Sequence, residues 1–505
     1  MIDKTNPGGA ASRHQSDRLV LVLILLLVFL MAARTPLDTD LWWHLRAGET
    51  TLQNGQPMLT DTLSYTRAGS PWINHSWLAE VGMALLFRTA GYLGLCAAVA
   101  FFAAASMAIL YRQMEGPALL RAFIILLATL VAAVVWTVRP QILSLVLLAV
   151  CGLILDQYRR KGIDRLWLLP PVFVLWSNLH GGYPLGLLLI GAVTAGEVVD
   201  GLYGNQTRWR ERWLRLRHLL IILALCELAV VINPNGLSMW KIPFQTVGVG
   251  VLQKAIPEWA SPDFHDLVQQ PFLWMLLLVI GIFSLAGRRI DGADWMAVVL
   301  FGAGGLMARR NFGPFAMVSA PILARYTWEA WQAFQGAHPG MTGRRTLSKI
   351  DRPVAPAFRK GLNLFLAALI GFVALIKLFV VSQPQLVSAY EHTLFPVDAV
   401  AWLQKNPQAG SLFNSYAWGG YLAWAYPEKA VFLDGRTDLF GDEIIDEWLT
   451  VTQAGAGWQK VLQKWQVRTV LLEPDQPVTN LLAGEGWKLV YQDATAVIYR
   501  KEPAR

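Results

Sequence analysis

Acidic, aromatic and basic side chains gather directly after the first apolar run of the chain. Asp38 and Asp40 are followed by Trp42, Trp43 and His44. Either carboxylate could act as the general base that deprotonates an acceptor hydroxyl, a role typically worth about 10²–10⁴ in rate. Two other roles fit the same residues: they could bind a divalent cation such as Mg²⁺ or Mn²⁺, or they could cap a helix.

A helix over residues 41–51 would place Asp40 and His44 on one face, four residues apart. These two side chains are therefore the candidate metal ligands of the segment. Trp42, Trp43 and His44, together with His75 further along, have the aromatic and hydrogen-bonding character that suits a sugar. The alternative is that the tryptophans pack at a membrane–water interface.

Four basic residues lie at the ends of apolar runs, where a cation often has an anionic partner. They are Arg139, His180, Arg309 and Arg310. Guanidinium groups bind phosphate oxygens in a bidentate manner, so the three arginines are candidate ligands for the phosphate of a lipid carrier. His180 is a candidate sugar-binding residue. The alternatives are arginine side chains that extend to the interface and a structural histidine.

Further candidates lie later in the chain. Glu258 stands beside aromatic residues and could serve as an acid, a base or a metal ligand, or could merely close a loop. Trp418 and Tyr421 flank a Gly-Gly pair, and Asp434 and Arg436 flank a glycine at the end of an apolar run. These four residues could bind substrate at the edge of a domain, or the last two could pair with each other to fix their loop.

The elements that position these residues are mostly membrane helices. The 505-residue chain has a mean hydropathy of +0.39 and is 54% hydrophobic but only 15% charged, against about a quarter in globular domains. The net charge of +8 lies in short basic segments between apolar runs. That pattern is typical of the cytoplasmic loops of membrane proteins and argues against nucleic-acid binding.

We expect a polytopic α-helical membrane protein with about eleven transmembrane helices. Residues 1–18 form a disordered cytoplasmic tail, and residues 19–381 form the transmembrane domain, with outer loops at 34–91 and 233–268. The short apolar segment 77–87 carries Glu80 and is expected to form an interfacial or half-inserted helix. The expected spans are 19–33, 92–111, 119–138, 141–157, 166–178, 182–200, 218–232, 270–286, 294–308, 313–330 and 361–381.

Residues 382–505 have the composition of a soluble α/β domain, which the topology places outside the cytoplasm. Strand-like and helix-like segments alternate there, which predicts a small sheet covered by helices. The expected strands are 411–416, 430–434, 469–472, 488–491 and 496–499, and the expected helices are 398–405 and 443–452.

This arrangement resembles the GT-C glycosyltransferases, in particular a bacterial branch of such membrane proteins. The residues that carry the resemblance are Asp38 to Gly48, Trp176 to Gly182, Arg309 to Asn311 and Trp418 to Arg436. The segment Trp418 to Tyr421 also partly resembles an acceptor-binding element of the oligosaccharyltransferase catalytic subunit. That element reads Trp-Trp-Asp-Tyr-Gly, whereas here Ala417 precedes Trp418 and the Asp is missing. Acceptor recognition therefore does not carry over.

The resemblance implies an inverting enzyme that transfers sugar from a polyprenyl-phosphate carrier to a glycan, lipid or protein acceptor. It also implies the inner membrane of the bacterial cell envelope, a cytoplasmic N-terminus and a periplasmic C-terminal domain. The acid at the start of the first outer loop is then catalytic, which by position is Asp38 or Asp40. The rival hypotheses are a lipid or glycan flippase and a non-catalytic assembly scaffold.

Overall fold

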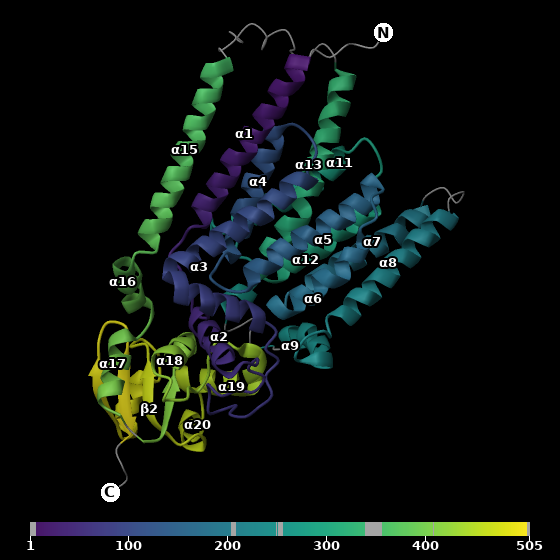
Figure 1. Cartoon of the computed structure of the whole chain (residues 1–505). Helices are drawn as coiled ribbons and strands as arrows, with labels where there is room; N and C mark the ends of the chain where they lie inside the picture. The colour runs from purple at the N-terminus through teal and green to yellow at the C-terminus, as the bar shows by residue number, and fades with distance from the viewer. Residues whose placement is uncertain are drawn as a thin grey trace, which may run out of the picture.

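The computed structural model describes residues 7–203, 209–248, 250, 256–338, 356–407 and 409–501. A helix corresponds to every predicted span, and these helices form one elongated bundle above a smaller mixed domain (Figure 1). They are α1 (Pro7–Ala32), α3 (Trp77–Gln113), α4 (Ala118–Ala132), α5 (Gln141–Lys161), α6 (Leu169–Leu179), α7 (Pro184–Tyr203), α8 (Trp209–Ala229), α11 (Gln270–Leu285), α12 (Gly292–Met307), α13 (Phe312–Ala337) and α15 (Pro356–Val381).

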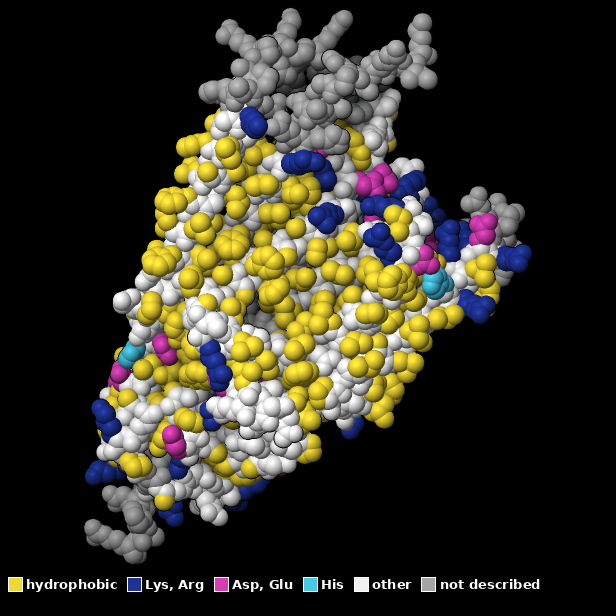
Figure 2. Space-filling model, in the orientation of Figure 1, with side chains coloured by type: hydrophobic (Ala, Val, Ile, Leu, Met, Phe, Trp, Pro, Cys, Tyr) yellow, Lys and Arg dark blue, Asp and Glu magenta, His cyan; other side chains and the backbone are white. Residues whose placement is uncertain are grey.

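Five helical stretches among the described residues are long and apolar enough to cross a membrane: Trp77–Gln113, Ala118–Val135, Gln141–Lys161, Pro184–Tyr203 and Lys360–Val381. Hydrophobic side chains cover most of the bundle face shown in Figure 2, whereas lysine and arginine gather near its upper end. On α15, Phe365 and Phe372 are each more than 60% exposed. Lipid would solvate such a surface, which water would not.

One prediction at the end of a helix is wrong in part, and one predicted helix continues into a longer one. Helix α1 begins at Pro7, so residues 7–18 are helical where the sequence predicted a disordered tail, and residues 1–6 lie outside the described part of the chain. The predicted interfacial segment Trp77–Phe87 is the first part of α3, which bends at Gly91 (φ 53°, ψ −144°). Glycine adopts this positive φ without steric cost, so the helix changes direction there.

The C-terminal domain is built on a four-stranded sheet with the order β1-β2-β4-β3. Strand β1 pairs with β2 in parallel, and β4 pairs antiparallel with both β2 and β3. The strands are β1 (Ser411–Asn414), β2 (Val467–Leu472), β3 (Trp487–Gln492) and β4 (Val497–Lys501), and the helices include α16 (Pro384–Leu394), α17 (Val397–Lys405), α18 (Gly419–Ala425), α19 (Thr437–Thr452) and α20 (Trp458–Lys464).

Four of the five predicted strands are confirmed, but the strand predicted at 430–434 is wrong. Its backbone is satisfied by other groups: Val431 exchanges hydrogen bonds with Leu63 and Tyr65 of the first outer loop. The side chain of Asn414 bonds to the backbone of Phe432 and Leu433. The segment therefore joins the domain to the outer loop instead of adding a strand to the sheet.

A buried ion-pair network strengthens the same junction. Arg436 of the C-terminal domain pairs with Asp61 of the outer loop at 2.9 Å and with Asp434 at 2.7 Å, and all three side chains are fully buried. The helix that follows Asp40, α2 (Leu41–Asn54), packs against α18. The outer loop is thus held between the helix bundle and the C-terminal domain, where the candidate site residues meet.

Candidate active site

A cavity of about 160 Å³ lies where the outer loops, the ends of the bundle helices and the C-terminal domain meet. Most of the polar residues singled out in the sequence line it, although they come from segments hundreds of residues apart. Its polar and aromatic lining includes Asp40, Trp43, His44, His75, Arg139, His180, Glu258, Trp259, Arg310, Tyr416, Arg436 and Asp438.

Three carboxylates converge on Arg139, which lies two residues before the start of α5. Its Nε lies 2.6 Å from Asp38 Oδ1, and its Nη1 lies 2.9 Å from Asp40 and 3.1 Å from Glu258. One guanidinium cannot neutralise three carboxylates. The cluster therefore carries surplus negative charge, and Arg139 has little capacity left to bind a phosphate.

The pKa of Asp40 reflects both its burial and this surplus of negative charge. Burial raises the pKa of its carboxyl to about 7, and the neighbouring acids Asp38 and Glu258 contribute to the rise although Arg139 opposes it. Gly435 of the C-terminal domain packs so closely that a Cβ atom there would overlap the Asp40 carboxylate. Asp40 precedes α2, but its side chain makes no capping hydrogen bond, so a capping role does not account for it.

His44 is held by a buried acid. Its Nδ1 lies 3.0 Å from Glu80 Oε1, and the other oxygen of Glu80 accepts a hydrogen bond of 2.7 Å from Asn74. Burial lowers the pKa of His44 well below its ordinary value, so the ring is neutral. Glu80 fixes the orientation of this ring where His44 lines the cavity.

The two arginines at the start of α13 point to different partners. Arg309 donates from Nε to the carbonyl oxygen of Pro257 at 2.7 Å and does not line the cavity. Arg310 lines the cavity, with its guanidinium 4.0 Å from the centre of the Trp259 ring. Only Arg310 of this pair is positioned to bind a ligand there.

Several residues predicted to bind sugar are placed in packed contacts instead. Trp42 is 2% exposed and its ring lies edge-on to Tyr421, 5.5 Å away. Asp434 and Arg436 form the buried ion pair with Asp61, which is the loop-fixing alternative left open by the sequence. Trp42, Tyr421 and Asp434 do not line the cavity, while Arg436 borders it as part of that ion pair.

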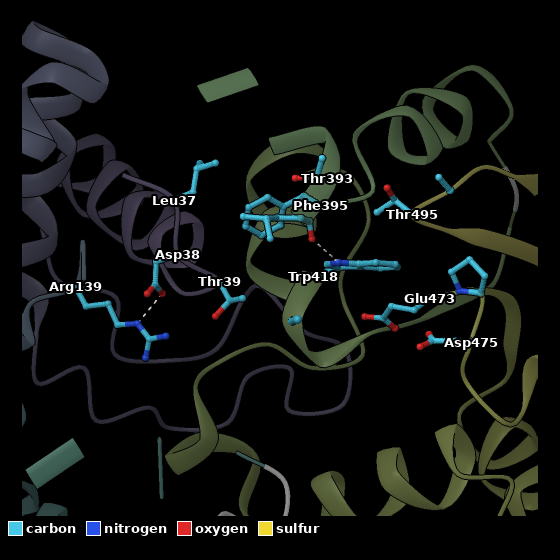
Figure 3. Close-up of a pocket in the computed structure, with 14 residues that line it drawn as sticks. Leu37, Asp38, Thr39, Arg139, Thr393, Phe395, Trp418, Glu473, Asp475 and Thr495 are labelled. Atoms are coloured by element: carbon cyan, nitrogen blue, oxygen red, sulfur yellow. Dashed lines mark hydrogen bonds and ion pairs between the residues drawn. The ribbon is translucent and has the colours of Figure 1, made fainter. Parts of the chain in front are cut away.

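A second, more open pocket of about 710 Å³ lies on the other side of Arg139 (Figure 3). Asp38 points to Arg139 at one end of it, and Trp418, Glu473 and Asp475 of the C-terminal domain border the other. Trp418 is itself nearly buried and donates from Nε1 to the carbonyl oxygen of Leu394. The Asp38–Arg139 pair thus stands between the two spaces.

Sequence reasoning missed three residues of the cavity region. Tyr416 and Asp438 line the cavity, and Glu80 holds His44. Glu80 had a usable signal, because it is the one charged residue in the apolar segment Trp77–Phe87. Tyr416 and Asp438 had none, since only the fold of the C-terminal domain brings them next to the outer loop.

The described residues include no group of three or more His, Cys, Asp or Glu arranged to hold a metal ion. The carboxylates that a divalent cation would need, Asp38, Asp40 and Glu258, converge on Arg139 instead. Asp40 and His44, the candidate pair, both line the cavity, where Asp40 pairs with Arg139 at 2.9 Å and His44 contacts Glu80.

No protein-family model and no curated protein matches the sequence. Solved structures do match the fold. An oligosaccharyltransferase from Archaeoglobus fulgidus, tethered to an acceptor peptide that contains the NVT sequon, aligns over 95% of this chain and 74% of its own, at 13% identity and a TM-score of 0.52.

The transferase ArnT from Cupriavidus metallidurans, in its apo state, aligns over 97% of this chain and 100% of its own, at 13% identity and a TM-score of 0.50. The same protein bound to undecaprenyl phosphate aligns over 96% of this chain and 98% of its own, at 13% identity and a TM-score of 0.49. The oligosaccharyltransferase and ArnT are both multi-pass membrane glycosyltransferases of the GT-C type. The chain therefore has the GT-C fold of integral membrane glycosyltransferases.

Proposed function

We propose that the chain is a glycosyltransferase that moves a sugar from a polyprenyl-phosphate donor to an acceptor hydroxyl at the extracytoplasmic face of a bacterial inner membrane. The observation that carries this proposal is the carboxylate pair Asp38 and Asp40 beside Arg139, at the mouth of a cavity between membrane helices and a C-terminal domain. The GT-C fold supports the reaction class, and ArnT provides a protein of this fold that binds undecaprenyl phosphate.

In the proposed reaction Asp40 is the general base. Its pKa of about 7 lets the carboxylate accept a proton near neutral pH, as efficient general-base catalysis requires. The acceptor oxygen attacks the anomeric carbon with inversion while its proton passes to Asp40. The bond from that carbon to the phosphate oxygen breaks, and polyprenyl phosphate leaves with the electron pair.

Asp38 has a positioning role in this proposal. Its Oδ1 accepts from Arg139 Nε and also from the backbone N–H of Asp40 at 2.9 Å. It therefore fixes both the guanidinium and the backbone that carries the base. Arg139 in turn stabilises the ionised form of Asp40 and opposes the rise that burial causes in its pKa.

The test is to supply purified protein with a membrane lipid extract and to follow loss of sugar from polyprenyl-phosphate carriers by mass spectrometry. Asp40→Asn should lower the rate by about 10²–10⁴, and Asp38→Asn should lower it less. The matched control is Glu443→Gln, an exposed acid of the C-terminal domain paired with Arg67, which should behave as wild type. If wild type consumes no carrier from a broad extract, or if Asp40→Asn matches wild type, the proposal is wrong.

A further inference from the structure

Two histidines face the cavity from different segments of the chain. His75 belongs to the first outer loop, and His180 follows α6; their ring centres are 5.8 Å apart and the rings are nearly perpendicular. Neither residue is used by the general-base chemistry assigned to Asp40. Their hydrogen bonds to the backbone define what each ring can offer a ligand.

Each Nδ1 atom receives a backbone N–H from the glycine pair after His180. The amide of Gly181 donates to His75 Nδ1 at 3.0 Å, and the amide of Gly182 donates to His180 Nδ1 at 3.0 Å. A backbone amide can only donate, so both Nδ1 atoms must carry a lone pair.

A serine hydroxyl completes the arrangement at each ring. Ser76 Oγ lies 2.9 Å from His75 Nδ1, and Ser144 Oγ lies 2.8 Å from His180 Nδ1. Ser144 also accepts a hydrogen bond from Trp176 Nε1 at 2.8 Å, so its own proton is directed to His180. Both Nδ1 atoms are thus acceptors with two donors each.

The proton of each neutral ring must therefore lie on Nε2. Burial lowers the pKa of both histidines, so the rings are neutral at pH 7. Among the hydrogen bonds of the described residues, neither Nε2 atom has a protein partner. Two N–H donors are thereby left available at the cavity.

The two glycines are required by this geometry. A Cβ atom on Gly182 would overlap Ser144 Oγ and lie 2.8 Å from His180 Nδ1. A Cβ atom on Gly181 would lie 3.1 Å from the His75 ring. The His180-Gly-Gly segment of the sequence thus places two amides against two imidazoles and fixes the protonated nitrogen of each.

Arg310 adds a positive charge to these two donors. It lines the same cavity, and within the described parts of the chain no carboxylate lies within ion-pair distance of it. It lies close enough to both rings for its charge to contribute to their lowered pKa. The facing carboxylates are Asp438, near His75, and Glu258, which is engaged by Arg139.

We propose that His75, His180 and Arg310 together bind phosphate oxygens, with the two histidines donating through Nε2–H and Arg310 supplying the charge. Phosphate oxygens offer only acceptors in the diester form, which matches the three donors that His75, His180 and Arg310 present. The inference rests on the proposed function, since it states which residues hold the phosphate of the donor. It assigns to the two histidines a contact with phosphate in place of the sugar contact predicted from the sequence.

The test uses the two amides that mimic the two histidine nitrogens. Asparagine places its amide near Nδ1, where its oxygen can still accept from Gly181 or Gly182, but it loses the Nε2 donor. Glutamine places an N–H near Nε2. Binding of farnesyl phosphate to the full-length protein in detergent would be measured by native mass spectrometry for His75→Asn, His75→Gln, His180→Asn, His180→Gln and Arg310→Met.

We expect each asparagine variant and Arg310→Met to weaken farnesyl phosphate binding at least tenfold, and each glutamine variant to stay within about threefold of wild type. Farnesol, which lacks the phosphate, should bind all variants equally. Equal affinities of the asparagine and glutamine variants would overturn the proposal, and so would wild-type protein that binds neither farnesyl phosphate nor inorganic phosphate. Inorganic phosphate binding with the same ranking but no preference for farnesyl phosphate would identify free phosphate as the ligand.

These outcomes are independent of the transfer assay. If farnesyl phosphate binds with the expected ranking but no carrier loses its sugar, the phosphate site stands and the glycosyltransferase proposal fails. If carriers are consumed but the ranking is absent, the reaction stands and the histidines have another role.

Discussion

Helix α5 begins and ends beside an arginine–carboxylate cluster, and the two clusters match their charges differently. The site cluster, before its first residue, has one arginine for three carboxylates: Arg139 with Asp38, Asp40 and Glu258. The distal cluster, at its last turn, has three arginines for three aspartates: Arg159, Arg160 and Arg325 with Asp156, Asp291 and Asp294. The half-exposed Glu115 also lies 3.5 Å from Arg325. Helix α5 has 21 residues and is therefore about 30 Å long, the thickness of a bilayer core.

The two clusters also differ in the size of the cavities beside them. The distal cluster borders a cavity of about 50 Å³, whereas the site cluster borders one of about 160 Å³ and a second of about 710 Å³. The cavity beside the distal cluster is thus the smallest of the three. Matched charges at one end thus hold helices together, while surplus carboxylate beside open space at the other end is available for chemistry.

The largest effect should follow from giving the distal cluster the charge imbalance of the site cluster. Arg325 is 3% exposed and pairs with Asp294 at 2.8 Å and Asp156 at 3.0 Å. Arg325→Met leaves buried carboxylates without their partner and should cost about 3–5 kcal/mol of stability. The measurement is the unfolding temperature of detergent-solubilised protein, followed by size-exclusion chromatography.

The matched control for this prediction is Arg288→Met. Arg288 pairs with Glu329 at 2.7 Å, but its side chain is half exposed, and such pairs contribute at most about 1 kcal/mol. An Arg325→Met protein as stable as the Arg288→Met protein would mean that the distal cluster does not hold the bundle together.

The second prediction removes surplus charge from the site cluster. The pKa of Asp40 is raised from 3.8 to about 7 in the folded protein, so the folded state binds its proton more tightly than the unfolded state. The resulting destabilisation therefore appears as pH rises above about 4 and is complete above about 7. Asp40→Asn should stabilise the protein at pH 8 by up to about 4 kcal/mol, measured as a higher unfolding temperature. At pH 4 the unfolding temperature should stay nearly unchanged.

The exposed acid Glu443 again supplies the comparison, since Glu443→Gln should alter the unfolding temperature little at either pH. A loss of stability in Asp40→Asn at pH 8 would show that Asp40 is chiefly a structural partner of Arg139. The site cluster would then have a structural role, as the distal cluster does.

The sequence predicted the membrane helices more completely than it predicted the roles of the site residues. Long apolar runs between basic segments predicted a helix at every expected span, because lipid imposes hydrophobicity on whole stretches of chain. The acids at the start of the first outer loop stood out for the same reason. Asp434 and Arg436 were harder to interpret, since ligand binding and ion pairing use the same side chains, and only their burial with Asp61 separates the two.

What the sequence could not predict is which distant residues meet. Trp42 looked like a sugar-stacking residue, yet it fills a packed contact with Tyr421, because α2 lies against α18. Arg139 looked like a free phosphate ligand, yet three carboxylates from two loops surround it. Contacts between residues 100 or more positions apart leave no local pattern of hydrophobicity or spacing.

The third prediction concerns the pH dependence of sugar transfer. If Asp40 is the base, the rate should rise about tenfold per pH unit below pH 7 and level off above it, because only the ionised carboxylate accepts the proton. Carrier consumption measured from pH 5 to 9 would check this. A midpoint near 4 would point instead to a carboxylate with an ordinary pKa.

The smallest effect should come from removing one neighbouring charge from the site cluster. Glu258 raises the pKa of Asp40 by charge repulsion, so Glu258→Gln should move the midpoint of the rate profile to lower pH, by less than about one unit. Glu473→Gln is the control, since Glu473 borders the other pocket and should leave the midpoint in place. A shift to higher pH in Glu258→Gln would mean that Glu258 acts on Asp40 mainly by holding Arg139 in position. The surplus of carboxylates would then be a means of placing the guanidinium and not a means of tuning the base.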